Sequence, residues 1–218
     1  MSSAEHFDVL IVGAGLSGIG AGWHLQKHCP ARRYVILEGR ERIGGTWDLF
    51  RYPGIRSDSD MYTLGYSFRP WRSAKAIADG PAILEYVRDT ARDHGIDRNI
   101  RFGHRVRHAS WSSADAKWTV DAERSSGETV RFTCNFLFMC SGYYSYEAGY
   151  TPEFPGTERF KGRIVHPQKW TDDIDYAGSR YDGPHRQDGR LSALGRRVPE
   201  VATLAYGWDA YDVEAGQR

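Results

Sequence analysis

The hydrophobic positions at the start of the chain predict two buried β-strands with a helix between them. Residues 7–12 (FDVLIV) and 34–37 (YVIL) are short runs rich in β-branched side chains, as expected for strands covered on both faces of a parallel sheet. Residues 19–28 (IGAGWHLQKH) have helical character, and Pro30 prevents the extension of this helix. This order of elements predicts a βαβ unit and therefore an α/β fold.

Three later segments predict further secondary structure, to which we assign no chemistry. Residues 80–95 place apolar side chains at helical spacing between Pro81 and Gly95, which predicts an amphipathic helix. Residues 111–120 and 128–138 alternate apolar and polar side chains around the turn sequence SSGE, which predicts a small antiparallel β-meander. Residues 136–140 (FLFMC) predict another apolar strand, and we expect Cys140 at its end to be a buried structural thiol with a raised pKa.

The turn between the first strand and the first helix has the spacing of a dinucleotide-binding motif. Gly13, Gly15 and Gly18 follow the pattern G-x-G-x-x-G. We expect Gly13 to form a tight turn, Gly15 to let a pyrophosphate approach the backbone, and Gly18 to allow close packing of helix against strand. Ser17 adds a hydroxyl at the helix N-terminus, where an anion is favoured, and Glu38, 20 residues after Gly18, is placed to accept ribose hydrogen bonds. The alternative is a glycine-rich turn that binds no ligand.

Composition narrows the range of partners and compartments. Of the 218 residues, 40% are hydrophobic and 26% are charged, which is typical of a globular protein. The net charge of +1, without a basic block, gives no reason to expect a nucleic-acid partner. Three cysteines without a CxxC pair indicate neither a disulfide framework nor a metal site. We find no signal peptide and no membrane-spanning run, and we expect a cytoplasmic protein.

A second glycine-rich segment follows Glu38. Residues 39–68 contain the pair Gly44-Gly45, which allows close approach of the backbone to a ligand, and Trp47, which offers a large stacking surface. Such a segment suits a flat, extended cofactor.

Residues 160–170 (FKGRIVHPQKW) carry the most specific pattern in the chain. They fit F-x-G-x-x-x-H-x-x-x-W at Phe160, Gly162, His166 and Trp170. Pro167 indicates that the His and the Trp lie in a turn or linker and not along one helix. With this pattern and the two glycine segments, residues 1–177 resemble the class B flavoprotein monooxygenases, the Baeyer–Villiger monooxygenases.

The resemblance implies a Rossmann-like, three-layer FAD/NAD(P)-binding domain that includes the β-meander, with FAD and NADPH as cofactors. By this resemblance Ser17 and Glu38 hold the pyrophosphate and ribose of FAD, and Val106 holds the adenine end through its backbone. The stretch that wraps the flavin corresponds to Gly45, Thr46, Trp47, Asp48 and Leu49. For Leu49 and Val106 the alternative is ordinary core packing.

The resemblance also identifies a candidate catalytic carboxylate. Asp58 matches the active-site aspartate of the family, which lies near the flavin and pairs with a downstream arginine. Arg56 and Ser57 match positions close to the nicotinamide cofactor. A carboxylate that orients an arginine beside the flavin can set the electric field at the reacting group. Without the resemblance, Asp58 reads as a solvated residue in the run SDSD.

After residue 177 the sequence departs from the family pattern, where an NADPH-binding domain is expected. Residues 178–218 have no second G-x-G-x-x-G, and only seven of them are Val, Leu, Ile, Met, Phe or Trp, too few for the sheet of such a domain. We therefore expect a FAD-binding domain at residues 1–170, incomplete relative to the family, and an atypical tail at 171–218. Our hypothesis is that the chain is a truncated product, read out of frame after about Ser179.

Two functions are compatible with these features. The first is a FAD-dependent, NADPH-using monooxygenase in which O2 forms a C4a-peroxyflavin that oxygenates a small molecule such as a ketone, thioether or thioamide. The second is a noncatalytic FAD-binding remnant of such an enzyme, with apolar surface exposed where packing partners are missing. A flavin reductase or disulfide oxidoreductase is a third reading, against which the 160–170 segment and the lack of CxxC argue. The sequence specifies neither the substrate nor the oligomeric state.

Overall fold

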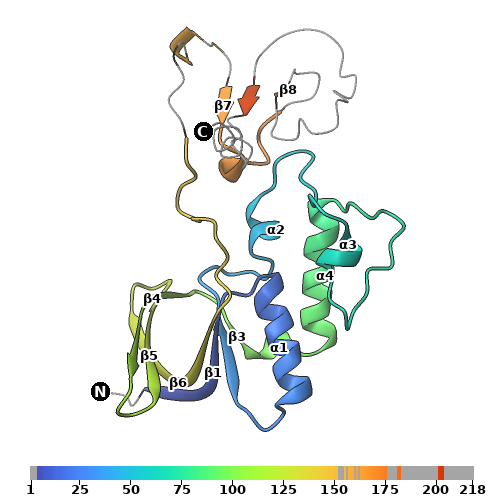
Figure 1. The fold of residues 1–218 in the computed structure, drawn as a ribbon. Helices are drawn as coiled ribbons and strands as arrows, with labels where there is room; N and C mark the ends of the chain where they lie inside the picture. Colours follow the sequence, from blue (N-terminus) through green and yellow to red (C-terminus); the bar gives the residue numbers. More distant parts are fainter. Residues whose placement is uncertain are drawn as a thin grey trace, which may run out of the picture. The chain divides into compact units, whose positions relative to one another are not determined.

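The chain divides into two compact units in the computed structural model (Figure 1). The structure describes residues 4–151, 155, 157–159, 161, 163–175, 181–182 and 201–203. The first unit comprises Met1–Leu49 and Arg56–Tyr143, and the second comprises Phe50–Ile55 and Tyr144–Arg218. All the candidate cofactor-binding residues predicted above belong to the first unit.

A six-stranded mixed sheet in the order β3-β2-β1-β6-β5-β4 forms the centre of the first unit. Its parallel part consists of β1 (Glu5–Val12), β2 (Tyr34–Leu37), the short β3 (Ile100–Arg101) and the second half of β6 (Thr129–Met139). Its antiparallel part consists of β4 (His104–Ser112), β5 (Lys117–Arg124) and the first half of β6. The two strands predicted from residues 7–12 and 34–37 are confirmed.

The helices cover one face of the parallel strands. α1 (Leu16–His28) and α4 (Gly80–Asp93) lie together on this side in Figure 1, followed by the 3-10 turn Ile96–Asn99. Two single-turn helices, α2 (Thr46–Leu49) and α3 (Met61–Leu64), lie in the connection between β2 and α4. The predicted helices at 19–28 and 80–95 are confirmed, and α4 begins with Pro81 in its first turn as expected.

Strand alternation divides the core into two clusters, which makes the unit three-layered. On the helix side, Val9 and Ile11 pack with α1 and α4 side chains. On the opposite side, Leu10 and Val12 pack with Val120 and other residues of the β-meander. Because side chains alternate across a strand, the same eight-residue strand serves both clusters. The predicted three-layer α/β architecture is confirmed.

The predicted boundaries of the meander are wrong in two places. Residues 111–120 are not one strand, because a turn separates the end of β4 at Ser112 from the start of β5 at Lys117. Ser112 closes this turn by accepting a hydrogen bond from the Asp115 amide, and Ala116 has a positive φ of 49°. The two segments predicted at 128–138 and 136–140 are one continuous strand, β6, which pairs with β5 from Thr129 to Cys134 and with β1 from Phe132 to Met139.

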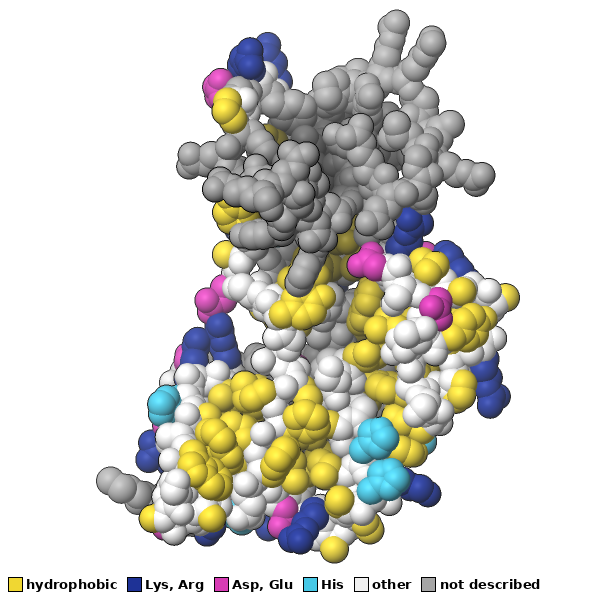
Figure 2. Space-filling view, in the orientation of Figure 1, with side chains coloured by type: hydrophobic (Ala, Val, Ile, Leu, Met, Phe, Trp, Pro, Cys, Tyr) yellow, Lys and Arg dark blue, Asp and Glu magenta, His cyan; other side chains and the backbone are white. Residues whose placement is uncertain are grey.

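The apolar end of β6 leaves large side chains exposed. Phe136 is 58% exposed and Met139 is 57% exposed. With Phe138, Leu16 and Leu25, Phe136 lines a groove of about 560 Å³ between β6 and α1. Figure 2 shows hydrophobic side chains gathered on one face of the first unit.

The second unit contains a small parallel sheet in the order β7-β9-β8. Its strands are β7 (Arg163–Val165), β9 (Val201–Thr203) and β8 (Tyr181–Asp182). Two of these strands, β8 and β9, come from the tail, for which we predicted too few apolar residues to build the sheet of an NADPH-binding domain. Residues 171–175 of the tail are also described, and its remaining residues lie outside the described part of the chain. Within the described ranges, no helix is both long enough and apolar enough to cross a membrane.

Candidate functional site

The glycine turn after β1 has the geometry that its sequence predicts. Gly13 has a φ of 102°, a left-handed conformation that favours glycine, and its amide donates to the Leu37 carbonyl at 2.8 Å. A methyl group on Gly18 would collide with the Gly13 carbonyl oxygen and would lie 3.6 Å from Ile11 of β1. The predictions of a tight turn at Gly13 and of close packing at Gly18 are therefore confirmed.

The N-terminus of α1 is suited to an anion. Its N-cap is Gly15, which supplies no side-chain hydrogen bond, and the first turn contains no acidic residue. In the described part of the chain, no side chain therefore caps the positive end of the helix dipole. Ser17 is exposed in this turn and also lines the groove beside β6.

Glu38 is buried at the end of β2, beside the glycine turn. One carboxylate oxygen, Oε2, accepts the Ala14 amide at 2.8 Å, and Oε1 accepts the Arg40 amide at 2.9 Å. The side chain is only 6% exposed, so these two hydrogen bonds fix its orientation. Each carboxylate oxygen has a second lone pair, which leaves acceptor capacity for a hydroxyl group.

The second glycine segment contacts the first. The Gly44 amide donates to the Ala14 carbonyl at 3.0 Å, and the Gly45 Cα lies 3.6 Å from the position of a Cβ on Gly15. Thr46, Trp47, Asp48 and Leu49 then form α2. The structure thus brings the two predicted glycine segments together, although they are 30 residues apart.

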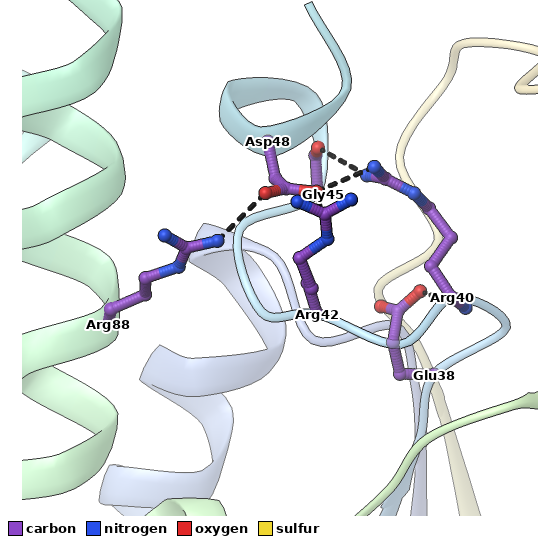
Figure 3. Close-up of polar contacts among 6 residues, drawn as sticks. All are labelled: Glu38, Arg40, Arg42, Gly45, Asp48 and Arg88. Carbon is purple, nitrogen blue, oxygen red and sulfur yellow. Dashed lines mark hydrogen bonds and ion pairs between the residues drawn. The ribbon is translucent and has the colours of Figure 1, made fainter.

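Asp48 lies at the centre of a cluster of arginines (Figure 3). Its side chain is fully buried, and its oxygens accept from Arg40 at 2.6 Å and from Arg88 of α4 at 2.8 Å. Arg42 approaches at 3.9 Å, and Arg40 also donates to the Gly45 carbonyl at 3.3 Å. A buried carboxylate requires such cationic partners because desolvation is costly. We did not predict any of these three arginines from the sequence. Two of them, Arg40 and Arg42, lie within four residues after Glu38, and this closeness to a predicted site residue could have identified them.

Trp47 and Val106 occupy positions consistent with both cofactor contact and packing. Trp47 is half-buried against the helix-side core, and Val106 of β4 packs partly against the meander-side core. His104, two residues before Val106, donates its amide to the Glu38 carbonyl at 2.9 Å. The structure therefore brings the start of β4 to the end of β2, next to Glu38.

Arg56, Ser57 and Asp58 form a separate part of the candidate site. Arg56 pairs with Asp79 in an isolated β-bridge. Ser57 is buried; its amide donates to the Ala78 carbonyl at 2.9 Å, and its Oγ accepts the Ala78 amide at 3.0 Å. Asp58 is exposed, and among the described residues its carboxylate has no recorded hydrogen bond or ion pair. The Ser57 hydroxyl therefore serves the local fold, whereas the Asp58 carboxylate faces solvent.

Cys140 follows β6 and lies against the glycine turn. Its amide donates to the Val12 carbonyl at 2.9 Å. Cys140 is only partly buried and not fully buried as predicted, but this burial raises the pKa of its thiol in the predicted direction.

The segment 160–170 belongs to the second unit, and Phe160 and Gly162 lie outside the described residues. His166 precedes the 3-10 turn Pro167–Lys169 and accepts the Gln168 amide at 3.2 Å, which confirms the predicted turn. Burial lowers the pKa of His166 below its usual value. Trp170 packs against Val165 and Ile174 within this unit.

Two family models match consecutive parts of the chain. The NAD(P)-binding Rossmann-like domain matches residues 11–79, and the flavin-binding monooxygenase-like model matches residues 76–181.

Curated relatives extend this similarity. The chain is 60% identical over 176 residues to the FAD-containing monooxygenase EthA of Mycolicibacterium smegmatis, which covers 81% of the chain and 36% of that protein. It is 62% identical over 172 residues to EthA of Mycobacterium tuberculosis, covering 79% of the chain and 35% of that protein. The chain thus spans about a third of the length of these relatives.

Solved structures show the same fold. A steroid monooxygenase bound to NADP matches with a TM-score of 0.66 and 33% identity, covering 82% of the chain and 34% of that protein. An open form of cyclohexanone monooxygenase matches with a TM-score of 0.67 and 28% identity, covering 83% of the chain and 35% of that protein.

Proposed function

The chain belongs to the flavin-binding monooxygenases, with the flavin-binding monooxygenase-like model matched at residues 76–181 and the Rossmann-like model at residues 11–79. On that premise we propose that its first unit binds FAD as part of a NADPH-using monooxygenase. We further propose that residues 1–170 form the FAD-binding domain and that the tail at 171–218 stands where the family has its NADPH-binding domain. The observation that carries the proposal is the N-terminus of α1, where no side chain caps the helix among the described residues and which lies beside the buried Glu38 and the Gly44-Gly45 segment.

The residues present fit a dinucleotide. The first-turn amides of α1, between Gly15 and Gly18, would donate to a pyrophosphate. Glu38 would accept from the ribose hydroxyls with the lone pairs that Ala14 and Arg40 leave unused. An alanine methyl group at position 15 would narrow the space through which a pyrophosphate approaches the backbone amides. This explains why glycine is favoured at position 15.

The remaining predicted residues would position the flavin and the nicotinamide. We assign the flavin-facing wall to Gly45, Thr46, Trp47 and Leu49, and the adenine end to the backbone of Val106. Bound FAD supplies the redox chemistry that activates O2. The exposed Asp58 carboxylate would orient a cation near the reacting group, and Arg56 would lie near the nicotinamide cofactor, with Ser57 holding this loop to residue 78.

The substrates we propose are small molecules with a ketone, thioether or thioamide group, consistent with the names of the similar cyclohexanone and steroid monooxygenases. Oxygenation of such a group requires NADPH and O2 as co-substrates.

The test separates FAD binding from turnover. The purified chain is mixed with FAD, freed of excess by gel filtration, and scanned for the visible absorption bands of oxidised flavin; NADPH consumption is then measured with and without a ketone. We expect retained flavin in the parent chain and little in a Glu38→Ala variant. Retained flavin without NADPH oxidation would restrict the function to noncatalytic FAD binding. A colourless parent chain would refute FAD binding by this chain.

A further inference from the structure

The Asp48 carboxylate joins its own helix to the loop just before it and to a helix 40 residues further along the chain. It lies in α2, Arg40 lies in the loop after β2, and Arg88 lies in α4 (Figure 3). Asp48 is 1% exposed, whereas the Arg88 side chain is 41% exposed. Charge-assisted hydrogen bonds of 2.6 and 2.8 Å to a buried carboxylate are short and directional, so this contact restrains the positions of all three elements.

The same cluster reaches the phosphate-binding turn through the backbone. Arg40 donates to the Gly45 carbonyl, and Gly45 lies against Gly15. The Gly44 amide donates to Ala14, whose own amide binds Glu38. On the other side, the Leu84 side chain of α4 contacts the position of a Cβ on Gly44. A displacement of Asp48 would therefore move the segment that faces the glycine turn.

We infer that Asp48, Arg40 and Arg88 are positioning residues that hold the Gly44–Leu49 segment in its FAD-binding conformation, and that the Asp48 side chain itself does not contact the cofactor. This inference rests on the proposed FAD site. It differs from the expectation that Asp48 binds the flavin directly, because the Asp48 side chain is 0% exposed and so offers no surface to a ligand.

The charge on Asp48 distinguishes positioning from direct anion binding. If the arginines contacted the FAD phosphates themselves, Asp48 would compete for them, and Asp48→Asn would bind FAD more tightly. If the arginines position the segment through Asp48, the same substitution weakens the restraint, and FAD binding becomes weaker. The two roles predict changes of opposite sign.

The experiment compares Asp48→Asn, Arg88→Met and Arg88→Lys with the parent chain. Arg92→Met is the matched control, because Arg92 lies one turn further along α4, is 68% exposed and pairs only with Asp89 and Asp93 among its recorded salt bridges. Hydrogen exchange of the FAD-free chain is measured at the amides of residues 44–49, four of which donate within the protein: Gly44, Trp47, Asp48 and Leu49. FAD affinity is measured separately by quenching of flavin fluorescence.

We expect the exchange rate of the amides of residues 44–49 to rise about tenfold in Asp48→Asn and Arg88→Met. This is the factor by which loss of one charge-assisted hydrogen bond shifts the local opening equilibrium. Arg88→Lys restores part of the protection, and Arg92→Met changes nothing. FAD affinity falls by about the same factor.

Unchanged exchange at 44–49 would overturn the inference whether or not the parent chain binds FAD. Tighter FAD binding by Asp48→Asn would also overturn it, whereas absence of FAD binding by the parent with the expected exchange pattern would count against the proposed function alone.

Discussion

Alanine at Gly15 and alanine at Gly18 should have opposite consequences, because only one of the two positions is filled by protein. At Gly15 an added methyl would meet nothing closer than the Gly45 Cα, at 3.6 Å, and the backbone (φ −85°, ψ −167°) is accessible to alanine. At Gly18 the methyl would collide with the Gly13 carbonyl oxygen, which belongs to the backbone and can move away only by distorting the turn.

The expected changes in the free energy of unfolding follow from these contacts. For Gly15→Ala, loss of a favourable N-cap costs up to about 1 kcal/mol, and reduced freedom of the unfolded chain returns about 0.4–1 kcal/mol. The net change is therefore close to zero. For Gly18→Ala, overpacking costs about 1–3 kcal/mol or more, and the higher helix propensity of alanine returns only about 1 kcal/mol. We expect a net loss of about 2 kcal/mol.

Stability should be more sensitive to Gly18→Ala, whereas FAD affinity should be more sensitive to Gly15→Ala. A methyl on Gly15 would separate the α1 amides from the pyrophosphate, and loss of one or two hydrogen bonds to a charged group, about 1.5–3 kcal/mol each, lowers affinity about a hundredfold. Urea unfolding gives the stability of each variant, and a fluorescence titration gives its FAD affinity. Gly15→Ala that binds FAD like the parent would refute the placement of the pyrophosphate, and Gly18→Ala as stable as the parent would refute the packing argument.

Four further predictions concern other parts of the first unit. Glu38→Gln should lower the free energy of unfolding by about 1–3 kcal/mol, because its hydrogen bonds to two amides lose their charge; urea denaturation measures this. Burial raises the pKa of Cys134 from 9.0 to about 11, so the folded state favours the neutral thiol, and stability should decline as the pH rises from about 9 to about 11; a Cys134→Ala variant should lack this part of the decline. In thiol labelling at pH 8, exposed Cys29 should react first and Cys134 only on unfolding. Phe136→Lys should reduce self-association of the chain, measured by light scattering, with little change in stability.

Local sequence patterns predicted the βαβ unit because its determinants are local. The strands at residues 7–12 and 34–37 are continuous apolar runs, and the turn between the first strand and α1 requires glycine where φ is positive at Gly13. The same is true of α4, whose start is marked by Pro81 and whose C-terminal side ends in Gly95 at a φ of 63°. Features of this kind depend on neighbouring residues alone and can be read without the tertiary structure.

The meander boundaries depend on pairing partners and could not be read in the same way. No glycine or asparagine marks the turn at residues 113–116, where Ala116 adopts the left-handed conformation. In β6 the change from antiparallel to parallel surroundings occurs without a break in the strand, because β5 ends its pairing at Cys134 while β1 continues to pair up to Met139. The alternating and the fully apolar patterns therefore describe two environments of one strand.

The contact between Asp48 and Arg88 shows what information is needed to find such a cluster. Asp48 is buried, and a buried carboxylate needs a cationic partner, but neither its burial nor the identity of that partner follows from the neighbouring residues. Local candidates follow Glu38, but the choice of Arg88 requires the helical repeat of α4. Leu84 and Arg88 are four residues apart on one face of α4, and they meet Gly44 and Asp48, which are also four residues apart. The matching intervals make α4, which we had expected only to pack, the support for the segment that faces the proposed cofactor.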